Sequence, residues 1–157
     1  MPYDDVKQAG RKNEYMADDQ RFATKRKDVL TYSTPALEED LTLAGPIISD
    51  IFLSCSGTDT DLVVKVIDQY PDSGVDAQLN PAGKSMAGYQ MLVRAEIMRA
   101  KFRTGFSNPK PLKIGAVEEV KFELQDIAHT FKKGHKLVVQ IQGSWFPLGD
   151  RNPGKFM

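Results

Sequence analysis

The amino-acid sequence predicts an all-β fold, a jelly-roll β-sandwich, from three observations. Residues 118–124 and 137–145 alternate apolar and polar side chains with a period of two, which is typical of a strand with one buried face. The connections between apolar segments are rich in Gly, Pro, Asn, Asp and Ser. No long segment requires a helix. About seven short strands joined by turn-rich loops are typical of such a sandwich.

Length and composition limit the classes of protein that are possible. The chain has 157 residues, of which 41% are hydrophobic and 27% charged, as in one ordinary globular domain. Lys and Arg number 21, and Asp and Glu also number 21, so we expect neither nucleic acid nor membrane as a partner. No apolar stretch of about 20 residues is present, and the polar N-terminus has no signal-peptide core. The compartment is therefore left unassigned.

Four short elements are expected in the first 55 residues. Residues 18–23 are expected to begin a single helical turn, because their acidic side chains suit the positive end of the helix dipole. Residues 29–32 and 41–44 are β-rich, and Gly45-Pro46 is expected to break the chain after the second strand. Residues 47–55 carry apolar side chains on both parities, which predicts a strand that is either covered on both faces or bent midway.

Residues 89–102 allow two interpretations. As a strand, the odd-numbered positions from Tyr89 to Ile97 form an apolar face. As a helix, Met91, Ala95 and Met98 recur at helical spacing, and the segment is rich in good helix formers. We favour the strand, because β-structure is predicted on both sides and tertiary context commonly overrides local propensity.

The two alternating segments near the C-terminus are the clearest strands of the chain. In the first, the apolar face consists of Val120, Phe122 and Leu124. In the second, the apolar face consists of Leu137, Val139, Ile141 and Trp145. The polar residues of the second segment, Gln140, Gln142 and Ser144, are expected on the opposite, solvent-facing side.

Residues 72–88 and 105–115 are expected to be exposed loops, and the first contains two apparent motifs. Gly83-Lys84-Ser85 ends like a phosphate-binding loop, but position 78 is Gln where that motif requires glycine. The same residues nearly match the G-x-S-x-G nucleophile elbow, yet the last position is Ala87 and no strand-to-helix turn is predicted there. A flexible loop serine is the simpler interpretation.

Asp59-Thr60-Asp61 begins like a calcium-binding loop. Apolar residues follow, starting with Leu62, where oxygen ligands and a glycine are needed. A turn in which short carboxylates cap backbone N–H groups explains the sequence without a metal. We therefore expect neither a metal nor a cofactor in this chain.

One cysteine and two histidines remain as candidates for chemistry. Cys55 lies at the end of an apolar run, so a buried, unreactive side chain is expected. The spacing between His129 and His135 suits no zinc motif. Either histidine would need a nearby serine and an orienting acid to act as a general base. The simpler interpretation places His129 in a turn and His135 at the start of a strand, so no catalytic residue is assigned.

Seven segments in this order resemble the C-terminal jelly-roll domain of one hydrolase family. They are residues 14–23 (EYMADDQRFA), 28–32 (DVLTY), 41–46 (LTLAGP), 58–72 (TDTDLVVKVIDQYPD), 88–94 (GYQMLVR), 131–137 (FKKGHKL) and 145–153 (WFPLGDRNP). Together they cover nearly the whole chain. The family contains X-Pro dipeptidyl peptidases, cocaine esterase and α-amino-acid ester hydrolases, and the last subgroup is the most similar.

The resemblance implies that the catalytic Ser, Asp and His, with the oxyanion-hole tyrosine, belong to an α/β-hydrolase domain that precedes this one. No residue of this chain matches those positions, so we expect the chain alone to be inactive. The family reaction is attack by an activated serine on an ester or amide. Members of the family release X-Pro dipeptides from peptides or act on small acyl esters and β-lactam amides.

The resemblance also implies a domain organisation. Residues 1–27 are expected to be a lead-in segment that follows the hydrolase domain, and residues 28–157 a jelly roll that lacks its last strands. The sequence is thus expected to be a fragment of a larger gene or a split gene product. The expected partner is the catalytic α/β-hydrolase domain of the same protein, and the full-length parent is compatible with a homo-oligomer.

The docking site for that domain is expected near the C-terminus. Its residues are Trp145, Phe146, Pro147, Asp150, Arg151 and Asn152. An aromatic pair beside an arginine is the kind of group that anchors an interface. The competing interpretation of the same residues is a buried turn that closes the sandwich. A stand-alone carbohydrate-binding module is the alternative function, and an independent enzyme using either histidine is a third.

Overall fold

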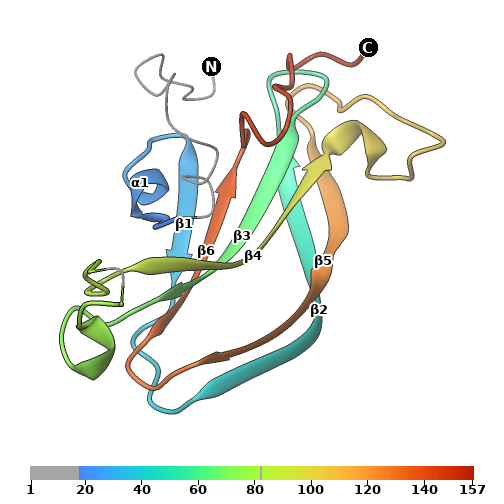
Figure 1. The fold of residues 1–157 in the computed structure, drawn as a ribbon. Coiled ribbons are helices and arrows are strands. Elements are labelled where there is room, and N and C mark those ends of the chain that lie inside the picture. Colours follow the sequence, from blue (N-terminus) through green and yellow to red (C-terminus); the bar gives the residue numbers. More distant parts are fainter. Residues whose placement is uncertain (1–17, 82) are drawn as a thin grey trace.

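The computed structural model describes residues 18–81 and 83–157. Within them, six strands form two antiparallel sheets that face each other, and helices are short (Figure 1). The elements are α1 (Arg21–Thr24), β1 (Val29–Ser33), β2 (Leu41–Ser54), β3 (Asp61–Gln69), η3 (Val75–Ala77), β4 (Gln90–Arg99), η4 (Ala100–Phe102), β5 (Val117–Phe131) and β6 (Lys136–Gln142). No helix in the described ranges has the length and apolar character needed to cross a membrane.

The larger sheet has the strand order β1-β6-β3-β4, and the smaller sheet pairs β2 with β5. Apolar side chains from both sheets pack between them. The buried cluster contains Leu62, Val64, Val66, Ala100, Leu112, Val120, Phe122, Leu124 and Phe131. Two antiparallel sheets around one apolar layer are a β-sandwich, so the predicted fold class is confirmed.

Strand β5 follows the predicted alternation. Val120, Phe122 and Leu124 are buried, while Glu119, Lys121 and Glu123 between them are exposed. The described strand extends beyond the predicted segment at both ends, to Val117 and Phe131.

The expected break at Gly45-Pro46 is wrong, because β2 runs through it. The register with β5 shifts between Gly45 and Ile47, so Pro46 lies in a bulge. Proline has no N–H to donate to the ladder, and a bulge leaves the position unpaired. The two expected strands are therefore one bent strand of 14 residues (Figure 1). The second half of this strand is not covered on both faces, since Ile48 and Phe52 are 61% and 69% exposed.

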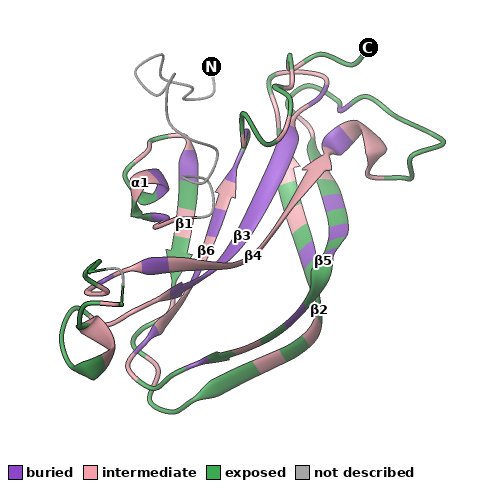
Figure 2. Ribbon diagram, in the orientation of Figure 1, coloured by how far each residue is buried: buried purple, intermediate pink, exposed green. Residues whose placement is uncertain are grey.

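Strand β3 is buried on both faces. Residues 61–68 are all buried, as the continuous buried colour of this strand shows (Figure 2). Leu62 and Val64 belong to the core between the sheets. Lys65 lies on the opposite face, where its ammonium group contacts Gln20 at the start of α1. The larger sheet is thus the middle layer between the small sheet and the N-terminal segment.

The polar face of β6 was expected to be solvent-exposed, and this expectation is wrong. Gln140 is 0% and Gln142 is 4% exposed. The Gln140 side-chain amide donates to Thr24 Oγ1 at 2.9 Å, so α1 covers this face. The apolar face, including Val139 and Ile141, packs against the core as predicted.

Residues 90–99 form strand β4, so the strand interpretation is confirmed. The expectation that this strand has one apolar face is wrong. Val93 and Met98 both pack against the core although they have opposite parity. The register with β3 shifts between Val66 and Ile67, and such a bulge reverses the faces beyond it.

Truncating Phe131 should test the core between the sheets. The side chain is 0% exposed, so Phe131→Ala should lower the free energy of unfolding by about 3–5 kcal/mol. The matched control is Phe52→Ala in the same sheet, where a 69% exposed ring should cost within about 0.5 kcal/mol. Denaturant unfolding measures both. Equal losses for the two variants would contradict the assignment of faces.

Candidate functional site: the C-terminal segment on the acidic turn

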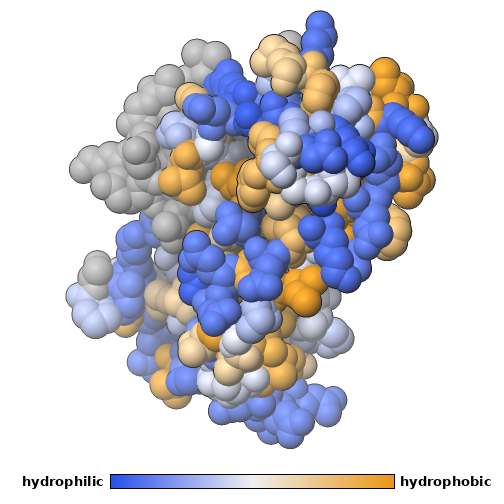
Figure 3. Space-filling model, turned by 90° about the vertical axis from the view of Figure 1, so that its right-hand side faces the viewer, coloured by the Kyte–Doolittle hydropathy of each residue, from blue (hydrophilic) through white to orange (hydrophobic). Residues whose placement is uncertain are grey.

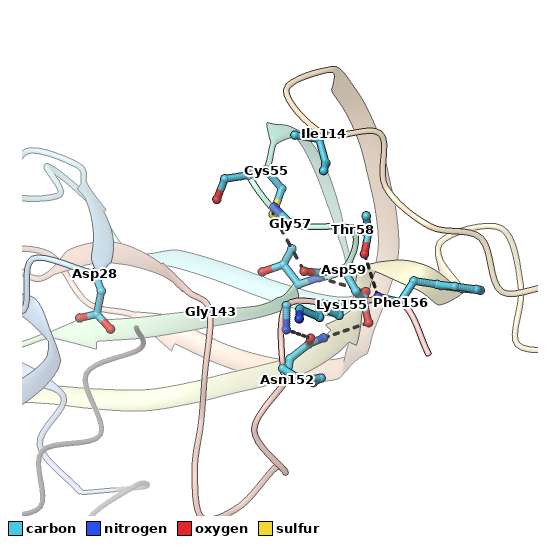
Figure 4. A pocket seen from close by; sticks show the side chains of 14 residues that line it. Asp28, Cys55, Gly57, Thr58, Asp59, Ile114, Gly143, Asn152, Lys155 and Phe156 are labelled. Carbon is cyan, nitrogen blue, oxygen red and sulfur yellow. Dashed lines mark hydrogen bonds between the residues drawn. The ribbon is translucent and has the colours of Figure 1, made fainter.

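The C-terminal segment, residues 143–157, follows β6 and lies against the acidic turn, residues 57–61, whose last residue begins β3 (Figure 1). An open cavity of about 1070 Å³ lies beside this junction. Cys55, Thr58, Asn152 and Phe156 are among its lining residues, and Figure 4 shows them converging from the turn and from the chain end. This junction holds the predicted docking residues in place.

The carboxylate of Asp59 ties three parts of the chain together. The side chain is 1% exposed. Its Oδ1 accepts hydrogen bonds from the backbone N–H groups of Thr60 and Lys101, both at 3.0 Å, and its Oδ2 accepts one from Asn152 Nδ2 at 3.1 Å. The predicted carboxylate capping is therefore present at Asp59.

Asp61 holds the same asparagine from the other side. Asn152 Nδ2 donates to Asp61 Oδ1 at 2.7 Å, and Arg99 Nε donates to the same oxygen at 2.9 Å. The neighbouring carboxylate raises the pKa of Arg99. One amide and one guanidinium thus satisfy two buried acids, as buried charges require. In the described part of the chain, no group of three or more metal-ligating side chains is placed to hold an ion.

Backbone contacts fasten the segment beyond Asn152. The Thr58 N–H donates to the Gly154 carbonyl at 3.1 Å, and the Phe156 N–H donates to Thr58 Oγ1 at 2.9 Å. Gly57 lies so close that an added Cβ would be 2.3 Å from the Gly154 oxygen. Only glycine allows this approach of two backbones.

Trp145 points inward, although it was expected to share the core face of β6. Its ring centroid lies 4.8 Å from Lys65 Nζ, on the face that α1 covers. The strand ends at Gln142, so the alternation does not continue to Trp145. Lys65 Nζ also donates to Gln20 Oε1 at 2.9 Å and lies 5.6 Å from the Phe22 ring centroid. The ammonium group is enclosed by two aromatic rings and one amide.

Lys65 is an unusual residue at the centre of a strand, since its side chain is 0% exposed. Burial, with a smaller effect from the positive charge of Arg26, lowers the pKa of Lys65 from 10.5 to about 7. Burial acts in this direction because it penalises the charged form of a lysine. The sequence alone predicts no role for Lys65, although a charged residue inside the apolar run Val-Val-Lys-Val-Ile is a signal of one.

The other predicted docking residues point outward. Phe146 is 41% exposed, and the guanidinium carbon of Arg151 lies 4.4 Å from its ring centroid. Pro147 and Asp150 are also exposed. The Asp150 carbonyl accepts a hydrogen bond from Arg99 Nη2 at 3.3 Å, which holds the backbone here. The six residues therefore divide into inward anchors, Trp145 and Asn152, and an outward face.

The two histidines meet at one carboxylate. Asp68 Oδ2 lies 2.9 Å from His129 Nε2, and Asp68 Oδ1 lies 2.8 Å from His135 Nδ1. His129 is in strand β5, so its expected place in a turn is wrong, whereas His135 immediately precedes β6 as expected. Asp68 was missed because it looked like one more residue of a β-rich run. No hydrogen bond joins either ring to a serine within residues 18–81 and 83–157.

Cys55 is partly buried beside the acidic turn. Its sulfur accepts a hydrogen bond from the Gly57 N–H at 3.3 Å, and the residue packs against the core cluster. The side chain is thus partly buried, not fully buried as expected, and it lines the open cavity beside the turn.

The buried Lys65, the carboxylates of Asp59 and Asp61 and the two histidines all make contacts that connect separate parts of the sandwich. The chain matches, over residues 4–156, the family described as the X-Pro dipeptidyl-peptidase C-terminal non-catalytic domain. This chain belongs to that family.

Known proteins resemble it along most of its length. It is 32% identical to the cocaine esterase of Rhodococcus sp. (strain MB1 Bresler), over 85% of this chain and 21% of that protein. An aminopeptidase from the marine sediment archaeon Thaumarchaeota archaeon is 42% identical with a TM-score of 0.81, over 92% of this chain and 23% of that one. An α-amino acid ester hydrolase is 41% identical with a TM-score of 0.78, over 91% and 22%.

The chain thus spans about a fifth of the length of these relatives. Nothing in these likenesses supports the alternative of a carbohydrate-binding module. The part of the expected lead-in segment over residues 1–17 lies outside the described residues.

Placing a side chain at Gly57 should loosen the C-terminal segment. Gly57→Ala puts a Cβ 2.3 Å from the Gly154 oxygen and should cost about 1–3 kcal/mol, as overpacking does. Amide exchange at Thr58 and Phe156 should accelerate. Gly143→Ala is the control, because its Cβ would meet Asp61 O at an ordinary 3.9 Å. Unchanged exchange in Gly57→Ala would show that the segment is not held here.

The buried ammonium should make stability depend on pH. Because the pKa of folded Lys65 is about 7 rather than 10.5, the unfolded state binds an extra proton between these values. The free energy of unfolding should therefore rise from pH 7 to about pH 9, by up to about 1.4 kcal/mol per pH unit. Lys65→Met should flatten this rise, and the exposed control Lys27→Met should not.

Urea titrations at several pH values measure this slope. Tyr70 and Tyr89 have raised pKa values and oppose the trend only at higher pH, where they begin to ionise. Identical slopes for the wild type and Lys65→Met would refute the role of Lys65.

Proposed function

We propose that this chain is the non-catalytic accessory domain of a serine hydrolase. In this proposal the reaction, hydrolysis of a peptide, ester or amide through an acyl-enzyme, takes place on a separate α/β-hydrolase domain of the same protein. The role of this domain is to pack on that catalytic domain and to help form the wall of the substrate cleft. The observation that carries the proposal is the match to a non-catalytic C-terminal domain family over residues 4–156.

The geometry of the C-terminal segment supports docking through its outward face. Asn152 is fixed by two buried carboxylates, and Trp145 is fixed over Lys65. Phe146 and Arg151 are consequently presented on a backbone that is already ordered. Binding through a preorganised group costs less conformational entropy, and stacked aromatic and arginine side chains are common anchors of interfaces.

A chimera tests the proposal. The segment of the α-amino acid ester hydrolase that this chain matches is replaced by this chain, with the rest of that enzyme unchanged. We expect an active enzyme. A protease site at the N-terminal boundary of the segment then allows the two parts to be separated. An inactive but folded chimera, or parts that separate freely after cleavage, would contradict the proposal.

Arg151→Ala should distinguish docking from a simple turn. In the cleaved chimera we expect weaker association of the two parts and a lower kcat/KM. The loss of association should be about 1–2 kcal/mol, as for a typical interface arginine. The stability of the isolated 157-residue chain should change by less than about 0.5 kcal/mol. The control is Arg21→Ala on α1. Unchanged association and kinetics with a lower melting temperature would favour the buried-turn interpretation.

A further inference from the structure

The loop that joins β4 to β5 carries a concentrated positive charge. Between Arg99 and Val117 there are five Lys or Arg residues and no Asp or Glu, in a chain whose formal net charge is zero. Two of the five are neutralised within the domain, because Arg99 pairs with Asp61 and Arg103 pairs with Glu118. Lys101 Nζ donates to the Met157 carbonyl oxygen at 3.4 Å, whereas Lys110 and Lys113 have no side-chain carboxylate within 4.0 Å of their ammonium groups among the described residues.

This loop is held rigidly although it has little regular structure. The Arg103 guanidinium donates to the carbonyl oxygens of Ala100, Lys110 and Pro111 as well as to Glu118. The Lys110 N–H donates to the Lys101 carbonyl at 2.8 Å. Leu112, which is 3% exposed, anchors the far side of the loop in the core. The hydrogen bonds of Arg103 thus hold the two ends of the loop together.

The rigid loop presents apolar side chains to solvent. Phe106 is 77% exposed and packs against Phe102 with ring centroids 5.3 Å apart. Figure 3 views the side of the molecule from which this loop projects and shows hydrophobic and hydrophilic side chains interspersed there. A single exposed ring is common on protein surfaces, so Phe106 indicates a binding site only together with the groove beside it.

A groove joins this loop to the outward face of the C-terminal segment. Its volume is about 240 Å³, and Phe102, Phe106, Ile97 and Gly149 are among its lining residues. This is smaller than a typical small-molecule site of about 300–1,000 Å³. An added Cβ at Gly149 would lie 2.9 Å from Ile97 Cδ1, so this glycine keeps the two walls close. The groove is of a size for one apolar side chain of a protein partner.

We infer that this groove and its lysines form the second half of the docking surface. The partner is a protein surface that inserts an apolar side chain between Phe106 and Gly149 and places carboxylates opposite Lys110 and Lys113. This inference rests on the proposed function, in which the partner is the hydrolase domain. It adds that the facing surface of that domain is acidic. Complementary charge of this kind fixes orientation and excludes wrong partners.

The cleaved chimera described above provides the test, with two variants and two matched controls. Phe106→Ala should weaken association of the two parts about tenfold or more, since exposed aromatic anchors dominate interfaces. Its control, Phe52→Ala, removes a ring that is 69% exposed from the outer face of β2. Lys110→Glu combined with Lys113→Glu should also weaken association and should reduce its dependence on salt concentration. Its control, Lys25→Glu combined with Lys27→Glu, changes the net charge equally at exposed positions beside α1.

The outcomes separate this inference from the proposed function. If the wild-type chimera is active and associated but both loop variants match their controls, the inference is wrong and the accessory role stands. If the wild-type chimera does not associate, the accessory role itself fails. The isolated chain is also mixed with phosphatidylserine vesicles. Binding to them that depends on Phe106 would assign the loop to a lipid surface and overturn the inference.

Discussion

Strand β3 is buried on both faces, and the arrangement of the other elements follows from satisfying its polar side chains. An ammonium or carboxylate withdrawn from water is costly unless it is paired or hydrogen-bonded. The Lys65 ammonium group donates a hydrogen bond to the Gln20 amide oxygen and contacts the Trp145 ring. The start of the N-terminal helix and the C-terminal segment therefore both pack on this strand. The Asp68 carboxylate is hydrogen-bonded to both His129 and His135. These contacts connect strand β5 and the turn before β6 to the same strand. Polar contacts thus fix the positions of these elements relative to β3, which non-directional apolar packing alone does not specify.

These same contacts account for the titratable groups that are buried among the described residues. A general base needs a nucleophile within hydrogen-bond reach. In the described residues, the imidazoles face Asp68, and the buried acids Asp59 and Asp61 face backbone amides, Asn152 and Arg99. The chemistry-bearing groups are used to order the structure. This agrees with membership of a family described as non-catalytic.

The net charge of zero conceals a polarised surface. Balanced totals rule out a strong overall field, but they say nothing about where the charges lie. The loop between β4 and β5 gathers cations, whereas the outer face of β5 carries Glu119 and Glu123 among its exposed residues. The basic loop adjoins the outward face of Phe146 and Arg151 through the groove at Gly149. One end of the sandwich therefore combines ordered backbone, exposed rings and the lysines Lys110 and Lys113, which is the composition expected of a docking surface.

The sequence by itself determined the all-β class, the family and the alternation of β5, because a period of two over Val120, Phe122 and Leu124 is a local property. It also located the C-terminal segment as the place of interest. Three features depended on what packs over each face. The polar face of β6 is buried because α1 lies on it, Trp145 turns inward because Lys65 needs enclosure, and β2 continues through Pro46 because a bulge accommodates the missing N–H. Only the tertiary structure decided these, since burial is set by neighbours that are distant along the chain, such as Gln20 for Lys65 and Asp68 for His129.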